Sequence, residues 1–335
     1  MKREIYMADL HTSYLGMTLP NPILAGSSGL TGNLTSLKHL EEHGIGGVVL
    51  KSLFEEQILQ QIRRETDKGG VIYGYEQIDE YLSYFERKHE IGKYMELITQ
   101  AKNELTVPVI ASINCVSAAE WQQIAAQIAE AGADALQLNM FIPPFLPDVE
   151  SSDIENEYFE IIKKVKSVVS IPVTAKIGPY FTSILSFSKK LLAAGADGLV
   201  LFNRYYSTDF DIETLSTKVG DYFSQAGEYS LPLRWTALLH DQFSAPITAA
   251  TGIHDGDTAI KMLLAGASAI EVVSALYSYS LERIAEMKSR LANWMEQKGY
   301  ETIDNFRGLM SQQRSAVPAE FQRVQYMKSY GDLKG

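Results

Sequence analysis

The stretch IAEAGADALQLN, residues 128–139, reads as the end of a helix, a glycine turn and a short apolar strand. Glycine just past a helix adopts the left-handed conformation that ends it, and an apolar run of this length is typical of a strand buried on both faces. The pattern occurs three more times, in LEEHGIGGVVLKS (40–52), LLAAGADGLVLFN (191–203) and LLAGASAIEVVS (263–274). This repetition predicts a fold assembled from β-then-α units.

A second group of segments begins its strands with proline, which is tolerated at the first residue of a strand because its missing N–H is not needed there. These segments are VPVIASIN (107–114), IPVTAKIG (171–178) and APITAATG (245–252), and NPILAGSSG (21–29) adds one more strand. The predicted strands lie near residues 23–27, 47–51, 108–113, 135–139, 172–177, 198–202, 246–251 and 269–273. Eight such units favour an α/β fold of the (β/α)8 TIM-barrel type over an open doubly wound sheet.

The stretch between residues 117 and 132 gives the clearest helix signal. Ser117 and Glu120 have the spacing of a capping box. Four apolar residues then recur at helical spacing, which predicts the face that packs on the strands. They are Trp121, Ile124, Ala125 and Ile128.

Two connections are longer than one helix with its loops: about 56 residues follow strand 2 and about 43 follow strand 6. Long β-to-α loops of a barrel lie over its C-terminal mouth, where active sites are built. The first connection holds a basic, glycine-containing stretch (63–70) and a tyrosine-rich stretch (73–84). It is either an ordinary loop followed by an aromatic-faced helix or a lid over a planar ligand. We expect one domain at 1–313 and a C-terminal tail at 314–335 that docks a second subunit.

Composition limits the kinds of molecule that the chain is expected to bind. The 335 residues are 46% hydrophobic and carry a formal net charge of −11, which argues against disorder and against non-specific nucleic-acid binding and favours a small-molecule substrate. Cys115 is the single cysteine, so an internal disulfide or a cysteine metal cluster is excluded and a reducing cytoplasm is expected. Neither a signal peptide nor an 18-residue apolar run is present, so no membrane association is expected.

Polar residues end several of the predicted apolar strands: Lys51, Asn114, Asn139, Lys176 and Asn203. An unpaired lysine or amide is costly in a core, so this set indicates a binding site at the mouth. Amides read donor and acceptor edges, and lysine stabilises developing negative charge, so the set suits a planar polar ligand.

Small residues end strands 7 and 8. In barrels the loops after these strands commonly bind phosphate through backbone N–H groups, so a phosphorylated planar cofactor is expected, with FMN the leading candidate. The residues concerned are Thr251, Gly252, Val273 and Ser274.

Short motifs along nearly the whole chain resemble those of the dihydroorotate dehydrogenases, which are FMN-dependent (β/α)8 barrels, and among them the soluble class 1 enzymes. The matching stretches are LGMTLPNPILAGSSG, VVLKS, SAAE, the LN of LQLN, AKIGPYF, ATGI, LLAGAS and QKGYETIDNFRG. The run from VIASINCVSAAEW to LQLN also resembles the pyrimidine-binding barrel of dihydropyrimidine dehydrogenase.

The resemblance implies roles for individual residues. Lys176 would approach the N1–O2 edge of the flavin, and Lys51 would lie beside flavin and substrate. Asn114, Asn139 and Asn203 would contact amide edges of the flavin or of the substrate. The implied substrate contacts are Lys51, Asn139 and Asn203. The remaining implied cofactor contacts are Ser28 and Gly29 beside the ring, Ser52, and Thr251, Gly252, Val273 and Ser274 at the phosphate. A homodimer is likewise implied.

The resemblance fails at the catalytic base. The family places cysteine or serine in a loop of the form LNLSCPN, whereas this chain has LNMFIPP, with Ile142 at the base position and Pro144 at the last asparagine. The orotate-binding asparagine loop after strand 2 also has no match. The catalytic residue is therefore unknown; Cys115 is a weak candidate beside its alternative role as a small buried hydrophobe, and Tyr180 and Asp148 lie in neighbouring loops.

Three functions remain open: oxidation of dihydroorotate to orotate in pyrimidine biosynthesis, a related FMN reaction on a different and more apolar substrate, and a catalytically idle ligand-binding barrel. In the second, Met140, Phe141 and Ile142 would line the pocket. The stretch His39–His43 fits an H-x-x-E-H zinc pattern but is explained by a charged outer helix face, so no metal is expected.

Overall fold

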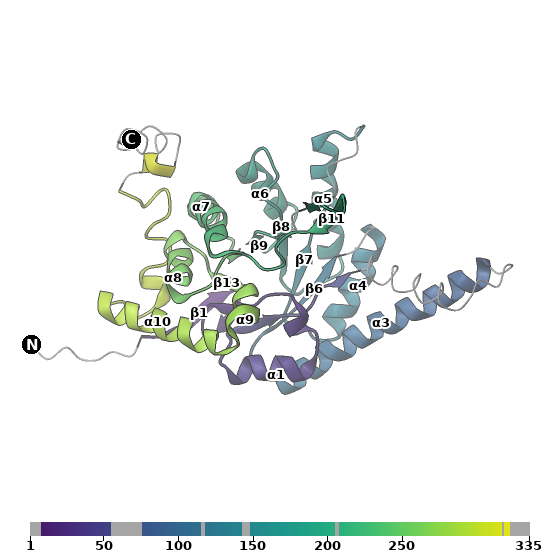
Figure 1. Cartoon of the computed structure of the whole chain (residues 1–335), viewed down its shortest axis with the longest axis horizontal. Coiled ribbons are helices and arrows are strands. Elements are labelled where there is room, and N and C mark those ends of the chain that lie inside the picture. Colours follow the sequence, from purple (N-terminus) through teal and green to yellow (C-terminus); the bar gives the residue numbers. More distant parts are fainter. Residues whose placement is uncertain are drawn as a thin grey trace, which may run out of the picture.

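The computed structural model describes residues 8–54, 76–114, 118–142, 148–204, 208–316 and 318–321 (Figure 1). Eight parallel strands form a closed barrel. They are β3 (Ile23–Ala25), β4 (Gly47–Val49), β6 (Val109–Asn114), β7 (Ala135–Asn139), β8 (Val173–Ile177), β9 (Gly198–Leu201), β12 (Ile247–Ala250) and β13 (Ala269–Val272). Pairing of β4 with both β3 and β6, and of β3 with β13, completes the ring. The predicted (β/α)8 barrel is confirmed, with each strand within two residues of its expected bounds.

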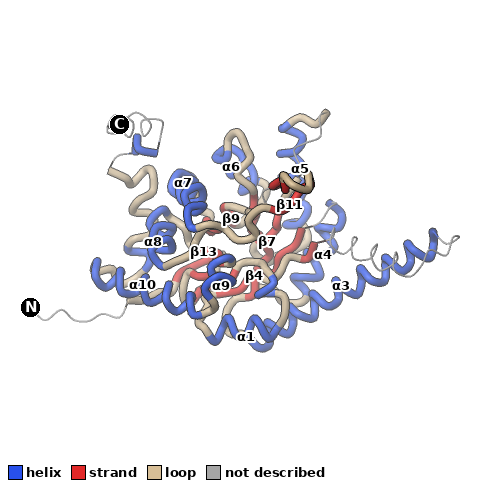
Figure 2. Tube along the Cα trace, viewed as in Figure 1, coloured by secondary structure: helices blue, strands red, loops and turns tan. Residues whose placement is uncertain are grey.

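Helices surround the strands in Figure 2. They are α1 (Leu34–Glu42), α3 (Glu76–Glu104), α4 (Ala118–Glu130), α5 (Ser151–Lys166), α6 (Ile184–Ala193), α7 (Ser230–Leu239), α8 (Gly256–Ala265), α9 (Ser274–Tyr279) and α10 (Glu282–Lys298). The predicted face of α4 is buried, with Trp121 at 2% exposure and Ile128 at 0%. In the described part of the chain, no helix has the length and apolar character that crossing a bilayer requires.

Four glycines follow helices and precede barrel strands, as the repeat predicts. Gly44, Gly132, Gly195 and Gly266 all have φ between 80° and 115°, the left-handed region. Gly266 is also closely packed, because an added Cβ would lie 2.2 Å from Cγ of His240. These turns let each helix reverse directly into its strand.

Strand 2 is interrupted, which the sequence does not predict. The expected strand 47–51 ends at Val49, and a two-residue strand, β5 (Leu53–Phe54), resumes the pairing with β6. The interruption is fixed by the neighbouring strand end, since the Ser52 N–H donates to Oγ of Ser27, just after β3, at 2.8 Å. Lys51 and Ser52 thus lie in a kink at the mouth.

An N-terminal hairpin closes the opposite end of the barrel, and it too was not predicted. Strands β1 (Thr12–Tyr14) and β2 (Met17–Leu19) pair antiparallel. Tyr14 is buried inside the barrel, where its OH accepts a hydrogen bond from Oγ1 of Thr248 at 2.8 Å. Burial raises the pKa of the Tyr14 phenol far above its usual value, so it stays protonated.

The N-terminal segment also meets the C-terminal part of the chain. Asp9 forms a parallel β-bridge with Thr302, and its N–H donates to the Glu301 carbonyl at 2.8 Å. Arg307 donates from Nη2 to Oγ1 of Thr12 at 2.6 Å. Segments about 290 residues apart therefore lie side by side at the closed end.

The long connection after strand 6 contains an antiparallel hairpin, β10 (Thr208–Asp211) and β11 (Ser216–Val219), followed by α7. In the connection after strand 2, residues 55–75, including the basic stretch, lie outside the described residues, and α3 follows them. Beyond residue 313, Arg314 approaches Asp241 at 3.4 Å, and the Phe321 carbonyl accepts from Arg234 at 2.7 Å. The division at residue 313 stays a prediction.

Candidate active site

A cavity of about 810 Å³ lies at the carboxyl ends of the barrel strands. All twelve residues that the sequence predicts for cofactor binding line it. They are Ser28, Gly29, Lys51, Ser52, Asn114, Asn139, Lys176, Asn203, Thr251, Gly252, Val273 and Ser274. Because they come from the ends of all eight barrel strands, the barrel closure brings together residues up to 246 positions apart.

A buried ion pair is part of the cavity lining. Lys176, on β8, donates from Nζ to Oε2 of Glu271, on β13, at 2.7 Å. The two side chains are 11% and 1% exposed. Lys176 stands out in the sequence as a polar residue near a strand end, whereas Glu271 stands inside an apolar strand with no signal of its own.

Buried polar atoms beside this pair have no hydrogen-bond partner among the described residues. They are both amide atoms of Gln137 and Oε1 of Glu271. Buried polar groups are paired in nearly all folded proteins, so such atoms in a cavity lining indicate a polar ligand that completes them. Gln137 is a second residue that the sequence analysis missed.

Two of the predicted amides contact each other across the mouth. Asn203 donates from Nδ2 to Oδ1 of Asn139 at 2.5 Å, which fixes how both amides are oriented. Asn114, at the end of β6, lines the same cavity and is partly buried. The donor and acceptor edges expected of the site are therefore present.

Serines connect the first three strand ends. The Ser52 hydroxyl lies 2.6 Å from Oγ of Ser112 and 3.1 Å from Oγ of Ser27. Tyr94, on α3, packs behind these serines and stabilises them, because its OH donates to the Ser112 carbonyl at 2.9 Å. Burial raises the pKa of Tyr94, so the phenol remains a donor.

Ser224 joins the ends of strands 7 and 8. Its N–H donates to Oγ of Ser274 at 2.9 Å, and its Oγ accepts from the Gly252 N–H at 3.3 Å. His254 lies behind it, with Nε2 3.0 Å from that Oγ. Ser224 and His254 are further residues at the predicted phosphate site; both come from loops whose approach the sequence does not reveal.

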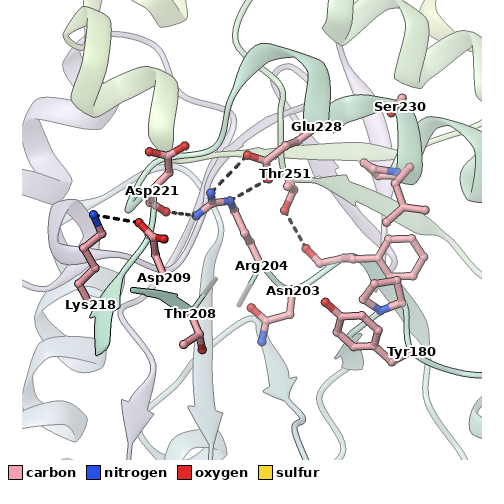
Figure 3. A pocket seen from close by; sticks show the side chains of 15 residues that line it. Tyr180, Asn203, Arg204, Thr208, Asp209, Lys218, Asp221, Glu228, Ser230 and Thr251 are labelled. Carbon is pink, nitrogen blue, oxygen red and sulfur yellow. Dashed lines mark hydrogen bonds and ion pairs between the residues drawn. The ribbon is translucent and has the colours of Figure 1, made fainter. Parts of the chain in front are cut away.

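Arg204 anchors the loop after strand 6. Its guanidinium donates to both carboxylate oxygens of Glu228, at 2.8 and 3.2 Å, and to the carbonyl of Asp221 at 2.8 Å (Figure 3). Desolvation raises the pKa of Glu228, but the hydrogen bonds from Arg204 and the Gln225 N–H outweigh it and leave the pKa lowered. Glu228 therefore stays charged.

A second cavity, of about 860 Å³, lies on the outer side of this ion pair. It shares Phe202, Asn203, Arg204 and Thr251 with the first cavity. In Figure 3, the Asp209–Lys218 pair of the hairpin borders it opposite Tyr180. The two cavities are therefore neighbours, and Arg204 lines both of them.

The base position of the resemblance lies in an apolar setting. Ile142 lines a separate cavity of about 90 Å³, together with Phe181, and its N–H donates to the Tyr158 OH at 3.0 Å. Phe141 lines both this cavity and the large one. Met140 is 1% exposed and packs in the core, so the expectation that it lines the pocket is wrong.

The alternative bases are placed only in part. Cys115 and Pro144 lie outside the described residues. Tyr180 is 74% exposed at the second cavity, and Asp148 is exposed. His39 lies on the outer helix α1 and His43 follows its last residue, and the described residues contain no group of three potential metal ligands.

Comparison with known proteins identifies what the chain is similar to. The family model described as "Dihydroorotate dehydrogenase" matches residues 78–295. The catalytic subunit of dihydroorotate dehydrogenase B (NAD(+)) from Thermoplasma volcanium is 28% identical over 309 residues, covering 90% of this chain and 99% of the relative. That from Pyrococcus abyssi is 27% identical, with 90% and 98% covered. The NAD-dependent dihydropyrimidine dehydrogenase subunit PreA of Escherichia coli K12 is 23% identical, with 93% and 79% covered.

Proposed function

Because the chain belongs to the dihydroorotate dehydrogenase family, we propose that it is an FMN-dependent oxidoreductase acting on a carbon–carbon bond of a small molecule. One observation carries the proposal: all twelve predicted cofactor residues line a single cavity at the carboxyl ends of the barrel strands. Bound FMN would supply the redox chemistry by accepting hydride from the substrate. Dihydroorotate, as the relatives' names suggest, is the first substrate to test.

The residues present fit FMN. The Gln137 amide offers unpaired hydrogen-bonding atoms to a ring edge, and Lys176 offers a cation. At the other end, Gly252 and Ser274 would hold the phosphate, with Ser224 and His254 as neighbours. The stacked rings of Phe223 and Tyr277, with centroids 5.3 Å apart, add an apolar wall.

The protein's own part in the reaction is to bind and orient. Asn139 and Asn203 fix each other and would present amide edges to the substrate. Lys51 stands at the exposed rim, where it would attract an anionic substrate group. A general base must reach the proton that it removes, and the Ile142 side chain cannot accept one.

A second candidate, an FMN reaction on a more apolar substrate, is favoured by one observation. The small cavity beside Ile142 is lined by Phe141, Ile154 and Phe181, and Phe141 connects it to the large cavity. An apolar substituent would suit this lining better than a carboxylate. Cytoplasmic location, a place in pyrimidine biosynthesis and a homodimer stay predictions.

The test is anaerobic titration of the purified protein. We expect FMN to bind with a visible flavin spectrum and dihydroorotate to bleach it. A protein that takes up no FMN contradicts the proposal, and the idle barrel then gains support. A yellow protein that dihydroorotate leaves oxidised, but that a more apolar unsaturated ring system reoxidises after dithionite reduction, identifies the second candidate.

A further inference from the structure

We propose that Glu271 is a positioning residue that compensates the charge of Lys176 and thereby lowers the reduction potential of the bound flavin. This inference rests on the proposed FMN function. It concerns a buried carboxylate in the cavity lining, which neither the sequence motifs nor the comparisons assign.

The pair is built into the barrel rather than formed by mobile surface side chains. Glu271 lies on β13 and Lys176 on β8, so each is held by a strand buried in the sheet, and their charged atoms are 2.7 Å apart. Gly26, directly after β3, packs closely on this part of β13, because an added Cβ there would lie 2.7 Å from Cγ2 of Val273 and 3.3 Å from Oε2 of Glu271. The surroundings therefore hold this carboxylate against this lysine.

Lys176 is the cation that the described residues bring to Glu271. The other carboxylate oxygen, Oε1, has no hydrogen-bond partner among the described residues. The 1% exposure of the side chain excludes bulk water. A buried charge is costly unless an opposite charge lies beside it, so the Lys176 ammonium is the group that compensates this carboxylate.

The electrostatic consequence for a ligand in this cavity follows from Coulomb's law. A lone lysine in a cavity lining stabilises the negative charge that a flavin ring gains on reduction, and so raises its reduction potential. An adjacent carboxylate offsets part of that field, because its opposite charge lies only 2.7 Å from the ammonium. The pair would therefore let Lys176 donate a hydrogen bond to the flavin without exerting the full effect of its positive charge on the ring. The reduced flavin becomes a stronger electron donor.

Four holoproteins test this: the native chain, Glu271→Gln, Lys176→Gln and the double variant. The formal charges of the pair are zero, +1, −1 and zero. The flavin midpoint potential is measured by dye equilibration, and the affinity for sulfite, which adds to flavin N5 and leaves negative charge on the ring, is measured by loss of flavin absorbance. The two readouts report on the charge near the ring and not on turnover.

We expect the potential to be highest in Glu271→Gln, similar in the native and double-variant proteins, and lowest in Lys176→Gln. Removing the carboxylate alone should strengthen sulfite binding at least tenfold. A tenfold change in the equilibrium between oxidised and two-electron-reduced flavin corresponds to a rise in midpoint potential of about 30 mV. A purely structural role for the pair would lower stability without producing this order.

The outcomes separate the two proposals. A native chain that takes up no FMN overturns the proposed function, and this inference with it. A native chain that binds FMN, with a Glu271→Gln potential equal to or below the native one, overturns the inference alone. If Glu271→Gln does not fold, the comparison of Lys176→Gln with the double variant still decides, because removing the carboxylate must raise the potential there too.

Discussion

At the residue scale, the site is defined by what surrounds each polar group. Lys176 and Lys51 both end predicted strands, yet Lys176 is buried against Glu271 whereas Lys51 is exposed at the rim. A buried lysine with a carboxylate partner acts through position and hydrogen bonding, and an exposed one acts through long-range attraction. Lysine therefore has two different roles at the mouth of the barrel, one through a fixed position and one through its charge.

Replacement of Ile142 tests the missing base directly. Ile142→Cys supplies a thiol that can accept a proton once it ionises, so flavin reduction by dihydroorotate should become at least ~10-fold faster, a smaller gain than the roughly 10²–10⁴-fold that a well-placed general base provides. The gain should increase with pH up to about 8.5, the ordinary pKa of cysteine. Stopped-flow absorbance measures the rate.

The matched control is Ile142→Val, which changes the packing but adds no base. If the valine variant gains as much as the cysteine variant, the effect comes from space and not from proton transfer. If neither gains, dihydroorotate is the wrong substrate, and the apolar cavity at Phe141 and Ile142 becomes the place to look for the right one.

At the element scale, the turns between helices and strands carry much of the fold's precision. Gly266→Ala should lower the free energy of unfolding by about 2–4 kcal/mol, because left-handed backbone strains alanine and overpacking adds to it. The added methyl would lie 2.2 Å from Cγ of His240, which Gly308 also contacts from the C-terminal segment. Urea unfolding measures the loss.

Gly299→Ala is the matched control for that substitution. Gly299 ends α10 with φ of 75°, but an added Cβ would have nothing within 4 Å. Gly299→Ala should lower the free energy of unfolding only by the cost of placing alanine in left-handed backbone, about 1–2 kcal/mol. Equal losses at both positions would show that contact with His240 has no energetic role.

Elements with local signals could be predicted from the sequence, and those set by distant contacts could not. Each barrel strand combines an apolar run with a glycine or proline before it, so all eight were found. The kink at Ser52 depends on hydroxyls of Ser27 and Ser112, 25 and 60 residues away. The first hairpin is held by Thr248, 234 residues from Tyr14, and its turn has only one typical turn residue, Gly16 at φ of 79°, beside Leu15 at φ of 52°.

The candidate site divides in the same way. Strand-end residues were predictable because a polar residue after an apolar run stands out. Glu271 was not, because its partner is 95 residues away and a single acidic residue inside an apolar strand has no pattern around it. Ser224 and His254 reach the site through loop paths that only the folded chain defines.

At the scale of the whole molecule, two histidines, the buried His254 and the half-buried His240, link stability to pH. Desolvation lowers the pKa of His254 and of His240 below the ordinary 6.5, against the smaller opposing effects of Ser224 and Asp241. Between the lowered and the ordinary pKa, the unfolded chain binds more protons than the folded one. The free energy of unfolding should therefore fall as the pH drops below about 6.5 and level off above it.

Urea unfolding at pH values from about 5.5 to 7.5 measures this slope, a range above most carboxylate titrations. The double variant His240→Gln and His254→Gln should be less stable overall but show a flatter dependence on pH. His39→Gln, on the outer helix α1, serves as the matched substitution. A double variant with an unchanged slope would assign the pH dependence to other groups.

The packing of the N-terminal hairpin against residues 301–307 at the closed end of the barrel constrains how the protein is made. The first hairpin leaves the ribosome early, yet its partners Thr248 and Arg307 are translated more than 230 residues later. The buried Tyr14 therefore has no native surroundings during most of synthesis, and the barrel floor can be sealed only after release of nearly the full chain.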